Sequence, residues 1–323
     1  MVNINTSTMK MREITFELTN SCNLRCRICN IWKEPKKKNL FLKDIQKVMK
    51  LADSPCSVSL TGGEPFLNPQ IDKIYRYLFR LHLQKKITGI DIATNAYSKK
   101  IIDFLSFNRN FLGPLSLSIS IDGLMKLHNS QRSKKDAFKR TITHISIIKK
   151  YNIPITLKFV ISRINYQDLF KVYAFAKKIG AAFNLKFFEK IPNYYHRHGD
   201  IAKLNPSRKQ LVKIEKIIDK IYEFERHNNK TLTRFSLSAI KKLLKSGNLD
   251  FVKRCLTPKR SLFITSSGKI HNCLYQNAVG DVKRLIKLDL KRCIRIIRRA
   301  EIGKCPKCLS YHGYLREFNA KRN

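Results

Sequence analysis

Three cysteines near the start of the chain have the spacing of an iron-sulfur site. Cys22, Cys26 and Cys29 are separated by three and two residues. Three thiolates can hold three irons of a [4Fe-4S] cluster, which leaves the fourth iron without a protein ligand and able to bind a small molecule. Considered in isolation, the same cysteines could also form a zinc knuckle or have no shared ligand. The spacing favours an open and reactive cluster.

A second group of four cysteines lies near the other end of the chain, at Cys255, Cys273, Cys305 and Cys308. Four thiolates can ligate one [4Fe-4S] cluster completely, or they can hold zinc in a zinc ribbon. The segment FITSSGKIHNC predicts a hairpin that leads to Cys273, because its glycine, Gly268, permits the positive φ of a tight turn. We therefore expect a closed site here.

The remaining cysteines and the chain ends indicate the cellular compartment. Nine cysteines are an odd number, and a disulfide framework is not expected in a reducing compartment. Cys56 and Cys293, which stand apart, are predicted to be buried structural thiols. The first residues lack the apolar run of a secretory signal, and no segment reaches the ~18 apolar residues of a membrane span. These features predict a cytoplasmic protein without a membrane span.

The charge of the chain is strongly positive. Its 323 residues include 65 Lys plus Arg against 23 Asp plus Glu, a formal net charge of +42. This charge creates a positive electrostatic field around the protein. The field attracts polyanions, which include RNA, an anionic lipid surface and a phosphorylated metabolite. The substrate could therefore be anionic, and nucleic acid is a possible partner that the charge alone does not favour.

The elements that position the first cysteine group belong to an α/β fold. Short β-branched runs alternate with helical periodicity, which predicts consecutive βα units and a parallel sheet. The predicted strands are 14–19, 57–61, 89–94, 115–121, 155–161 and 183–189, and the clearest helices are 44–52, 71–81, 137–151, 169–180 and 207–229. Active-site loops of a βα barrel lie at the C-terminal edge of the strands, and the first cysteine group directly follows the first strand.

Two motifs together carry a family resemblance. TNSCNLRCRICNIW (19–32) resembles the cluster loop of radical S-adenosylmethionine (SAM) enzymes, and LTGGEP (60–65) follows at the end of the second strand. The resemblance implies a partial (β/α)6 TIM-like barrel that binds a [4Fe-4S] cluster and SAM. It also implies reductive cleavage of SAM to a 5′-deoxyadenosyl radical, which abstracts a substrate hydrogen.

The GGEP motif is expected to bind SAM. Without a Cβ, Gly62 and Gly63 let the strand end approach the methionine end of SAM and offer it main-chain hydrogen bonds. The resemblance further implies that Glu64 offers its carboxylate to the SAM ammonium and that Pro65 fixes the turn. These four residues are therefore predicted cofactor contacts.

Further SAM contacts are implied at the end of the third strand. Thr94 and Asn95 lie in ATNAY, where the family usually has Thr-Asn-Gly, so Ala96 replaces a glycine and the local turn could differ.

The cysteine loop departs from the family pattern at one position: the residue before the third cysteine, usually aromatic, is Ile28. For Trp32, the only tryptophan, we expect a packing role in preference to cofactor contact.

The fourth and fifth strands supply the remaining candidates. SISIDG places Ser120 and Asp122 at the barrel mouth, as the family's Ser-Leu-Asp-Gly does, with His128 and Arg132 in the loop that follows. Ser120 is expected to meet the SAM carboxylate, and Asp122 and Arg132 are predicted to lie at the cofactor. Lys158 on the fifth strand could point outward or contact SAM.

The second cysteine group resembles that of the twitch domain, a shortened relative of the SPASM domain behind many radical SAM barrels. This resemblance implies one auxiliary [4Fe-4S] cluster. The predicted organisation is a radical SAM core at 10–200, a helical linker at 201–249, a twitch or SPASM-like domain at 250–315 and a tail at 316–323.

The resemblance implies a function in general terms only. Hydrogen abstraction, with an auxiliary cluster aiding oxidation, would dehydrogenate a small molecule or modify a peptide, and a reductant protein such as flavodoxin or ferredoxin would supply the electron. A second possibility is radical modification of RNA, to which the charge points. A rival class is a zinc-stabilised nucleic-acid-binding protein without catalysis, which would explain the cysteines and the charge but not GGEP.

Overall fold

The computed structural model describes residues 11–52, 55–187, 204–227, 260–274 and 277–282. Of the predicted features, Cys255, Cys293, Cys305, Cys308, most of the linker and the tail lie outside these residues. The described residues form the barrel, one long helix and a small C-terminal group of strands.

A parallel sheet forms the centre of the barrel, with each of its first six strands beside the next one in the chain. These strands are β1 (Glu13–Thr19), β2 (Cys56–Gly62), β3 (Ile87–Thr94), β4 (Leu115–Ser120), β5 (Ile155–Ile161) and β6 (Ala182–Phe187). Their bounds confirm the strands predicted from the sequence, with end points differing by two residues at most. The α/β fold with a parallel sheet is confirmed.

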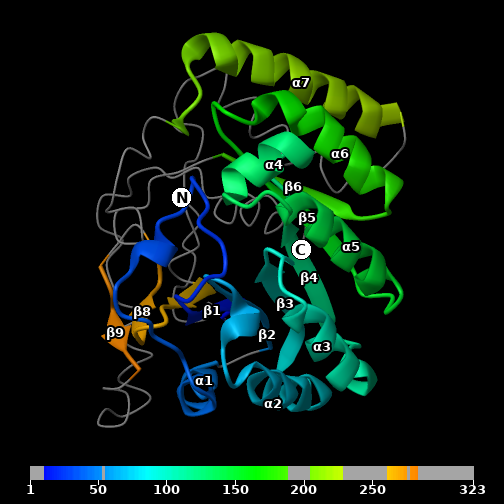
Figure 1. Cartoon of the computed structure of the whole chain (residues 1–323). Helices are drawn as coiled ribbons and strands as arrows, with labels where there is room; N and C mark the ends of the chain where they lie inside the picture. Colours follow the sequence, from blue (N-terminus) through cyan, green and yellow to red (C-terminus); the bar gives the residue numbers. More distant parts are fainter. Residues whose placement is uncertain (1–10, 53–54, 188–203, 228–259, 275–276, 283–323) are drawn as a thin grey trace, which may run out of the picture.

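Helices cover one side of this curved sheet (Figure 1). They are α1 (Leu42–Met49), α2 (Ile71–Leu83), α3 (Lys100–Phe107), α4 (Met125–Arg132), α5 (Ala137–Lys149), α6 (Leu169–Lys178) and α7 (Arg208–His227). Short 3-10 turns are η2 (Ile31–Lys33), η3 (Pro65–Leu67), η4 (Arg109–Phe111) and η5 (Tyr166–Asp168). The long helix predicted for residues 207–229 is confirmed as α7.

The apolar core lies between the sheet and these helices. Alternate residues of each strand, such as Ile14, Phe16 and Leu18 of β1, are fully buried and belong to one cluster with apolar residues of the helices. Cys56 at the start of β2 is 1% exposed, which confirms its prediction as a buried thiol. Because successive side chains of a strand point to opposite faces, the residues between these buried ones face away from the helices.

Three short strands extend the sheet beyond β1, and they come from the C-terminal part of the chain. They are β7 (Ser261–Ile264), β8 (Lys269–His271) and β9 (Gly280–Asp281), and the full order is β6-β5-β4-β3-β2-β1-β7-β8-β9. β7 pairs parallel with β1, and β8 returns antiparallel. Gly268 has φ +89° in the turn between β7 and β8, so the predicted hairpin is confirmed.

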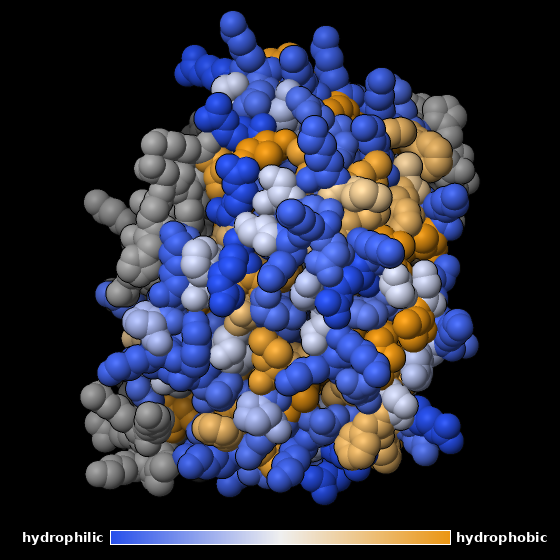
Figure 2. Space-filling view, in the orientation of Figure 1, coloured by the Kyte–Doolittle hydropathy of each residue, from blue (hydrophilic) through white to orange (hydrophobic). Residues whose placement is uncertain are grey.

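The outer surface is mainly hydrophilic. Figure 2 shows hydrophilic side chains over most of the visible face, with apolar side chains in small groups. None of the helices in the described ranges is both long and apolar enough to cross a membrane.

Candidate active site

The cysteine loop leaves β1 and is fixed at both ends by asparagines. Asn20 donates from Nδ2 to the carbonyl of Lys36 over 2.9 Å and accepts from the backbone N–H of Lys38 over 2.7 Å. Asn68 is buried and donates from Nδ2 to the carbonyls of Leu18 (2.7 Å) and Leu40 (2.9 Å). Neither role is visible in the sequence, because each asparagine bonds to residues far away in the chain.

The three thiols lie in poorly solvated surroundings. Burial, with further negative charge from Cys26, Glu64 and Cys29, raises the pKa of Cys22 to about 12. Burial likewise raises the pKa of Cys29 to about 11 and that of Cys26 above its ordinary value. Buried thiols of this kind become stable thiolates only when a cation compensates their charge, which iron does.

The donor set suits a cluster better than a single ion. Within the described residues, no three Cys, His, Asp or Glu side chains converge closely enough to hold one metal ion. The three cysteine sulfurs of a [4Fe-4S] cluster lie farther apart than the ligands of a single metal ion, because each cysteine binds a different iron. Three cysteines in one loop therefore fit a cluster with an open corner.

The two glycines at the end of β2 are required by the cysteine loop itself. Gly62 has φ +146°, and a Cβ there would lie 2.3 Å from the carbonyl oxygen of Thr19. A Cβ on Gly63 would lie 2.2 Å from the carbonyl oxygen of Ser21 and 2.9 Å from the Cβ of Cys22. The strand end therefore packs directly against the loop, and Gly63 donates a 2.8 Å backbone hydrogen bond to Thr19.

The carboxylate of Glu64 joins the ends of β2 and β3. It is 1% exposed and accepts from Thr94 Oγ1 over 2.8 Å and from the backbone N–H of Asn95 over 2.9 Å. Burial raises the pKa of Glu64 to about 7, against the effect of these hydrogen bonds. The structure thus brings three predicted cofactor residues together, with the Glu64 carboxylate engaged by its neighbours. Pro65 begins η3 directly afterwards.

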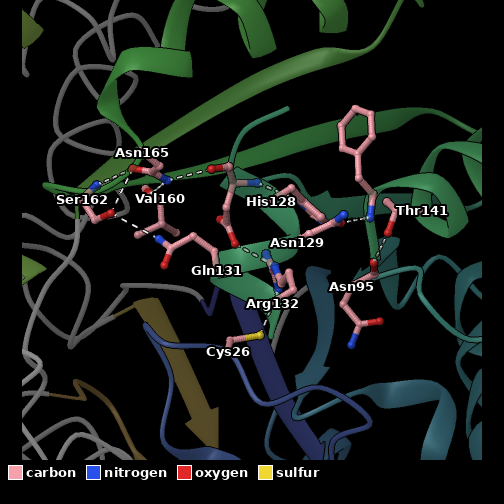
Figure 3. Close-up of polar contacts among 12 residues, drawn as sticks. Cys26, Asn95, His128, Asn129, Gln131, Arg132, Thr141, Val160, Ser162 and Asn165 are labelled. Atoms are coloured by element: carbon pink, nitrogen blue, oxygen red, sulfur yellow. Dashed lines mark hydrogen bonds and ion pairs between the residues drawn. The ribbon is translucent and has the colours of Figure 1, made fainter. Parts of the chain in front are cut away.

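Asn95 reaches from β3 to the cysteine loop. Its Nδ2 lies 2.9 Å from Asn23 Oδ1 and 3.9 Å from Cys22 Sγ. Helix α5 holds the segment from behind, since Thr141 donates to the carbonyl of Asn95 over 3.2 Å (Figure 3). Ala96 has φ +51°, so the turn keeps a conformation suited to glycine although an alanine occupies it.

Asp122 and Arg132 form a buried ion pair next to Cys26. Arg132 Nε lies 2.7 Å from Asp122 Oδ2, and Arg132 Nη1 donates to Cys26 Sγ over 3.6 Å (Figure 3). Their side chains are 9% and 0% exposed. The Asp122 charge and the thiols raise the pKa of Arg132 despite its burial, so the guanidinium stays charged.

The prediction that His128 and Arg132 lie in a loop was wrong, since both belong to α4. This helix spans only eight residues and contains too few apolar positions for a helical period to show in the sequence. Burial lowers the pKa of His128 to about 3, and its neutral ring accepts from the backbone N–H of Asp122 through Nδ1 over 3.2 Å. His128 therefore supports Asp122.

A polar network behind Asp122 fixes its backbone. Asn165 donates from Nδ2 to the carbonyl of Asp122 over 3.1 Å and accepts from the Ser162 hydroxyl over 3.0 Å. Gln131 donates to the same hydroxyl over 3.2 Å, which ties α4 to the end of β5 (Figure 3). All three side chains are fully buried, so this network is a rigid support.

The other predicted residues take the following places. Ser120 ends β4 on the face turned away from the helices, and Lys158 lies on that same face of β5, with Nζ 3.6 Å from Asp91 Oδ2. Trp32 donates from Nε1 to the carbonyl of Cys26 over 3.3 Å and so supports the cysteine loop. Cys273 follows β8 and is partly buried.

This chain is similar in sequence to a family model over about half of its length and to curated relatives over most of it. Residues 16–176 match the family model described as Radical SAM superfamily. An AdoMet-dependent heme synthase from Methanosarcina barkeri (strain Fusaro / DSM 804) is 25% identical over 331 residues, which cover 92% of this chain and 88% of the relative. A GTP 3′,8-cyclase from Aliarcobacter butzleri (strain RM4018) is 23% identical over 316 residues, covering 92% and 91%.

Solved structures share the fold. Native anSMEcpe with bound AdoMet matches with a TM-score of 0.63 at 17% identity, over 94% of this chain and 88% of that one. Streptococcus suis SuiB bound to S-adenosylmethionine matches with a TM-score of 0.62 at 15% identity, over 88% of this chain and 65% of SuiB. Together with the cysteine loop and the parallel sheet, these matches identify residues 16–176 as a radical SAM superfamily domain.

Proposed function

We propose that the protein is a radical SAM enzyme, with a [4Fe-4S] cluster on Cys22, Cys26 and Cys29. The observation that carries this proposal is the packing of the GGEP strand end against the cysteine loop, where Gly63 has no room for a Cβ. When bound, the cluster and SAM supply a 5′-deoxyadenosyl radical that abstracts a hydrogen atom from the substrate.

The residues around the loop have distinct proposed roles in binding SAM. The N–H groups of Gly63 and Glu64 donate to the carbonyls of Thr19 and Ser21, so the main-chain carbonyls of the GGEP segment would accept from the SAM ammonium, while Ser120 would donate to the SAM carboxylate. The geometry supports Thr94 and Asn95 as residues that hold Glu64 and the Cys22 loop in place. We therefore propose that Thr94 and Asn95 support SAM binding indirectly, by positioning Glu64 and the cysteine loop.

The Asp122–Arg132 pair has a further proposed role. Its guanidinium reaches Cys26 from α4, so a positive charge lies where a cluster and a carboxylate-bearing cofactor would both bring negative charge. Asp122 holds this guanidinium in place through the 2.7 Å ion pair. We infer that Arg132 binds at the cofactor while anchored by Asp122.

We also propose an auxiliary [4Fe-4S] cluster on Cys255, Cys273, Cys305 and Cys308, in a twitch or SPASM-like domain at 250–315 that follows the core at 10–200 and the linker at 201–249. Such a cluster would accept an electron from the substrate radical and aid dehydrogenation of a small molecule or modification of a peptide. The named relatives, a heme synthase and a GTP cyclase, differ in their reactions, and so they do not select one. A flavodoxin or ferredoxin would deliver the first electron.

Anaerobic reconstitution tests the proposal. Wild-type protein loaded with iron and sulfide should show broad absorbance near ~400 nm and, with dithionite, convert SAM to 5′-deoxyadenosine. Cys26→Ala should abolish this conversion, while Cys56→Ala, which removes a buried thiol outside the loop, should retain it. Zinc in place of iron, without that absorbance, would overturn the proposal that the protein is a radical SAM enzyme.

A second candidate function is radical modification of RNA, which is one of the polyanions that a net charge of +42 would attract. Binding through phosphates must weaken steeply as salt concentration rises, because counterions are released. A shift assay with transfer RNA over a salt series tests this candidate. Absence of salt-sensitive affinity would eliminate it.

A further inference from the structure

The face of the barrel sheet that is turned away from the helices, here called the inner face, is lined by small and polar side chains. Figure 1 shows the helices on the opposite side of the sheet. By strand alternation the inner face comprises every second residue of β1 to β6, among them Ser57, Asp91, Ser116, Ser118, Thr156 and Lys158. Most of these residues are partly exposed.

This composition differs from that of a barrel whose interior is filled by its own side chains. In closed (β/α)8 barrels the interior is a packed core dominated by Val, Ile and Leu. Here Ala93, Val160 and Ala182 are the only apolar residues of the inner face, and the many serine, threonine and glycine residues have short side chains or none. A surface with space and many hydrogen-bonding groups is suited to a polar molecule.

One cluster on this face, here called the Asp91 cluster, contains a charged pair. Asp91 on β3 accepts from the hydroxyls of Ser116 (3.2 Å) and Ser118 (2.9 Å) on β4. Lys158 on β5 lies 3.6 Å from the second carboxylate oxygen. The side chains of Asp91 and Lys158 are each 26% exposed, so both can be reached from the inner face.

The chemistry of the Asp91 cluster selects for one kind of ligand group. Asp91 only accepts hydrogen bonds and Lys158 only donates them, whereas the two serine oxygens retain lone pairs. A phosphate or carboxylate would be repelled by Asp91, and an ammonium group would be repelled by Lys158. A hydroxyl both donates and accepts without carrying charge. Adjacent hydroxyls could therefore bond to the carboxylate and the ammonium at once.

We propose that the Asp91 cluster binds a vicinal diol of the substrate, so that the substrate is a polyol or contains a sugar ring. The cluster is well placed for this role: Asp91 lies three residues before Thr94 on β3, and at 3.3 Å per residue it is about 10 Å below the strand ends. The C–H bonds of such a ring are the bonds from which a hydrogen atom could be abstracted. This inference rests on the proposed function, which supplies the radical that attacks such a bond.

Binding to the reconstituted protein, in the presence of SAM, tests the proposal by equilibrium dialysis. Two probes carry a vicinal diol from different sources, the ribose of GTP and the ring of myo-inositol, and 2′,3′-dideoxy-GTP lacks the diol. We expect at least one diol probe to bind. If GTP binds, 2′,3′-dideoxy-GTP should bind more weakly; if only myo-inositol binds, the source is a free ring.

Asp91→Asn should weaken binding of that probe about tenfold, as expected for loss of a hydrogen bond to a charged group. Asp103→Asn makes the same change in the exposed Lys99–Asp103 pair at the start of α3 and should have no effect. If Asp91→Asn does not fold, Ser118→Ala replaces it, with weaker binding again expected.

The proposal is overturned if neither diol probe binds, if the dideoxy nucleotide binds as tightly as GTP while myo-inositol does not bind, or if the cluster variant binds like wild type. Formation of 5′-deoxyadenosine by the wild-type protein is measured separately. Diol binding that depends on Asp91, without SAM cleavage, would refute the proposed function and leave the binding site standing. SAM cleavage without diol binding would refute the diol site and leave the proposed function standing.

Discussion

The guanidinium of Arg132 donates to the thiol of Cys26 over 3.6 Å, although the two residues are 106 positions apart in the chain. The contact forms because the cysteine loop docks on the end of α4, where the backbone N–H of Arg27 also donates to the carbonyl of Gln131 over 2.9 Å. Helix α4 therefore places a positive charge at one of the three predicted cluster ligands.

Arg132→Gln should lower the midpoint potential of the reconstituted cluster. A cationic donor at a thiolate ligand stabilises the reduced, more negative cluster, so its removal makes reduction harder. A tenfold change in the redox equilibrium corresponds to about 59 mV for one electron, and we expect a shift of this order. Potentiometric titration followed by electron paramagnetic resonance measures it.

Two further variants separate this effect from a loss of folding. Arg132→Gln leaves Asp122 as a buried charge without its partner, which costs about 3–5 kcal/mol of stability. The double variant with Asp122→Asn removes both charges and should keep the lowered potential, while Arg132→Lys should shift it less. Equal midpoint potentials in all variants would contradict a role for the Arg132 charge.

Gly63→Ala should displace the cysteine loop and destabilise the protein by about 1–3 kcal/mol, because the new methyl group would overlap the backbone of Ser21. Thermal unfolding and iron content after reconstitution measure the two effects. Gly113→Ala is the matched control, since a Cβ at Gly113 meets nothing within 4 Å. Similar iron content in both variants would show that the loop tolerates the methyl group.

Asn68→Ala should destabilise the protein by about 2 kcal/mol, since the buried carbonyls of Leu18 and Leu40 would lose their donor. The cysteine loop would also be less well anchored, so iron should be released faster to a chelator. Asn110→Ala, on the exposed turn η4, serves as control. A release rate equal to that of the control would mean that Asn68 does not hold the loop.

Glu64 predicts a pH dependence of stability in the cluster-free protein. Its pKa is about 7 in the folded state and 4.5 ordinarily, so between these values the folded state holds a proton that the unfolded state has lost. The stabilising contribution of Glu64 to the free energy of unfolding is therefore full below pH 4.5. It declines by about 3 kcal/mol as the pH rises toward 7, and then levels off.

Urea unfolding of wild type and Glu64→Gln across this pH range isolates the contribution, because the glutamine does not titrate. The difference in free energy of unfolding between the two proteins should change with pH between 4.5 and 7. A constant difference would show that burial does not raise the pKa of Glu64.

The sequence by itself determined the features that depend on neighbouring residues. Strand alternation and helical periodicity arise from local geometry, so the six strands and α7 were predictable, as was the turn at Gly268. Ligand spacing in the Cys22 loop is local as well. The eight residues of α4 were missed because so short a helix carries too few apolar positions to show a period.

Only the tertiary structure decided which distant groups meet. It pairs β7 with β1, and a backbone N–H at Ser266 donates to Glu17 over 3.0 Å across 249 positions. It also engages the Glu64 carboxylate with Thr94 and Asn95, although the sequence predicted the SAM ammonium as its partner. Such contacts depend on how strands and helices pack, and a charged side chain in a sequence does not reveal which buried partner will compensate it.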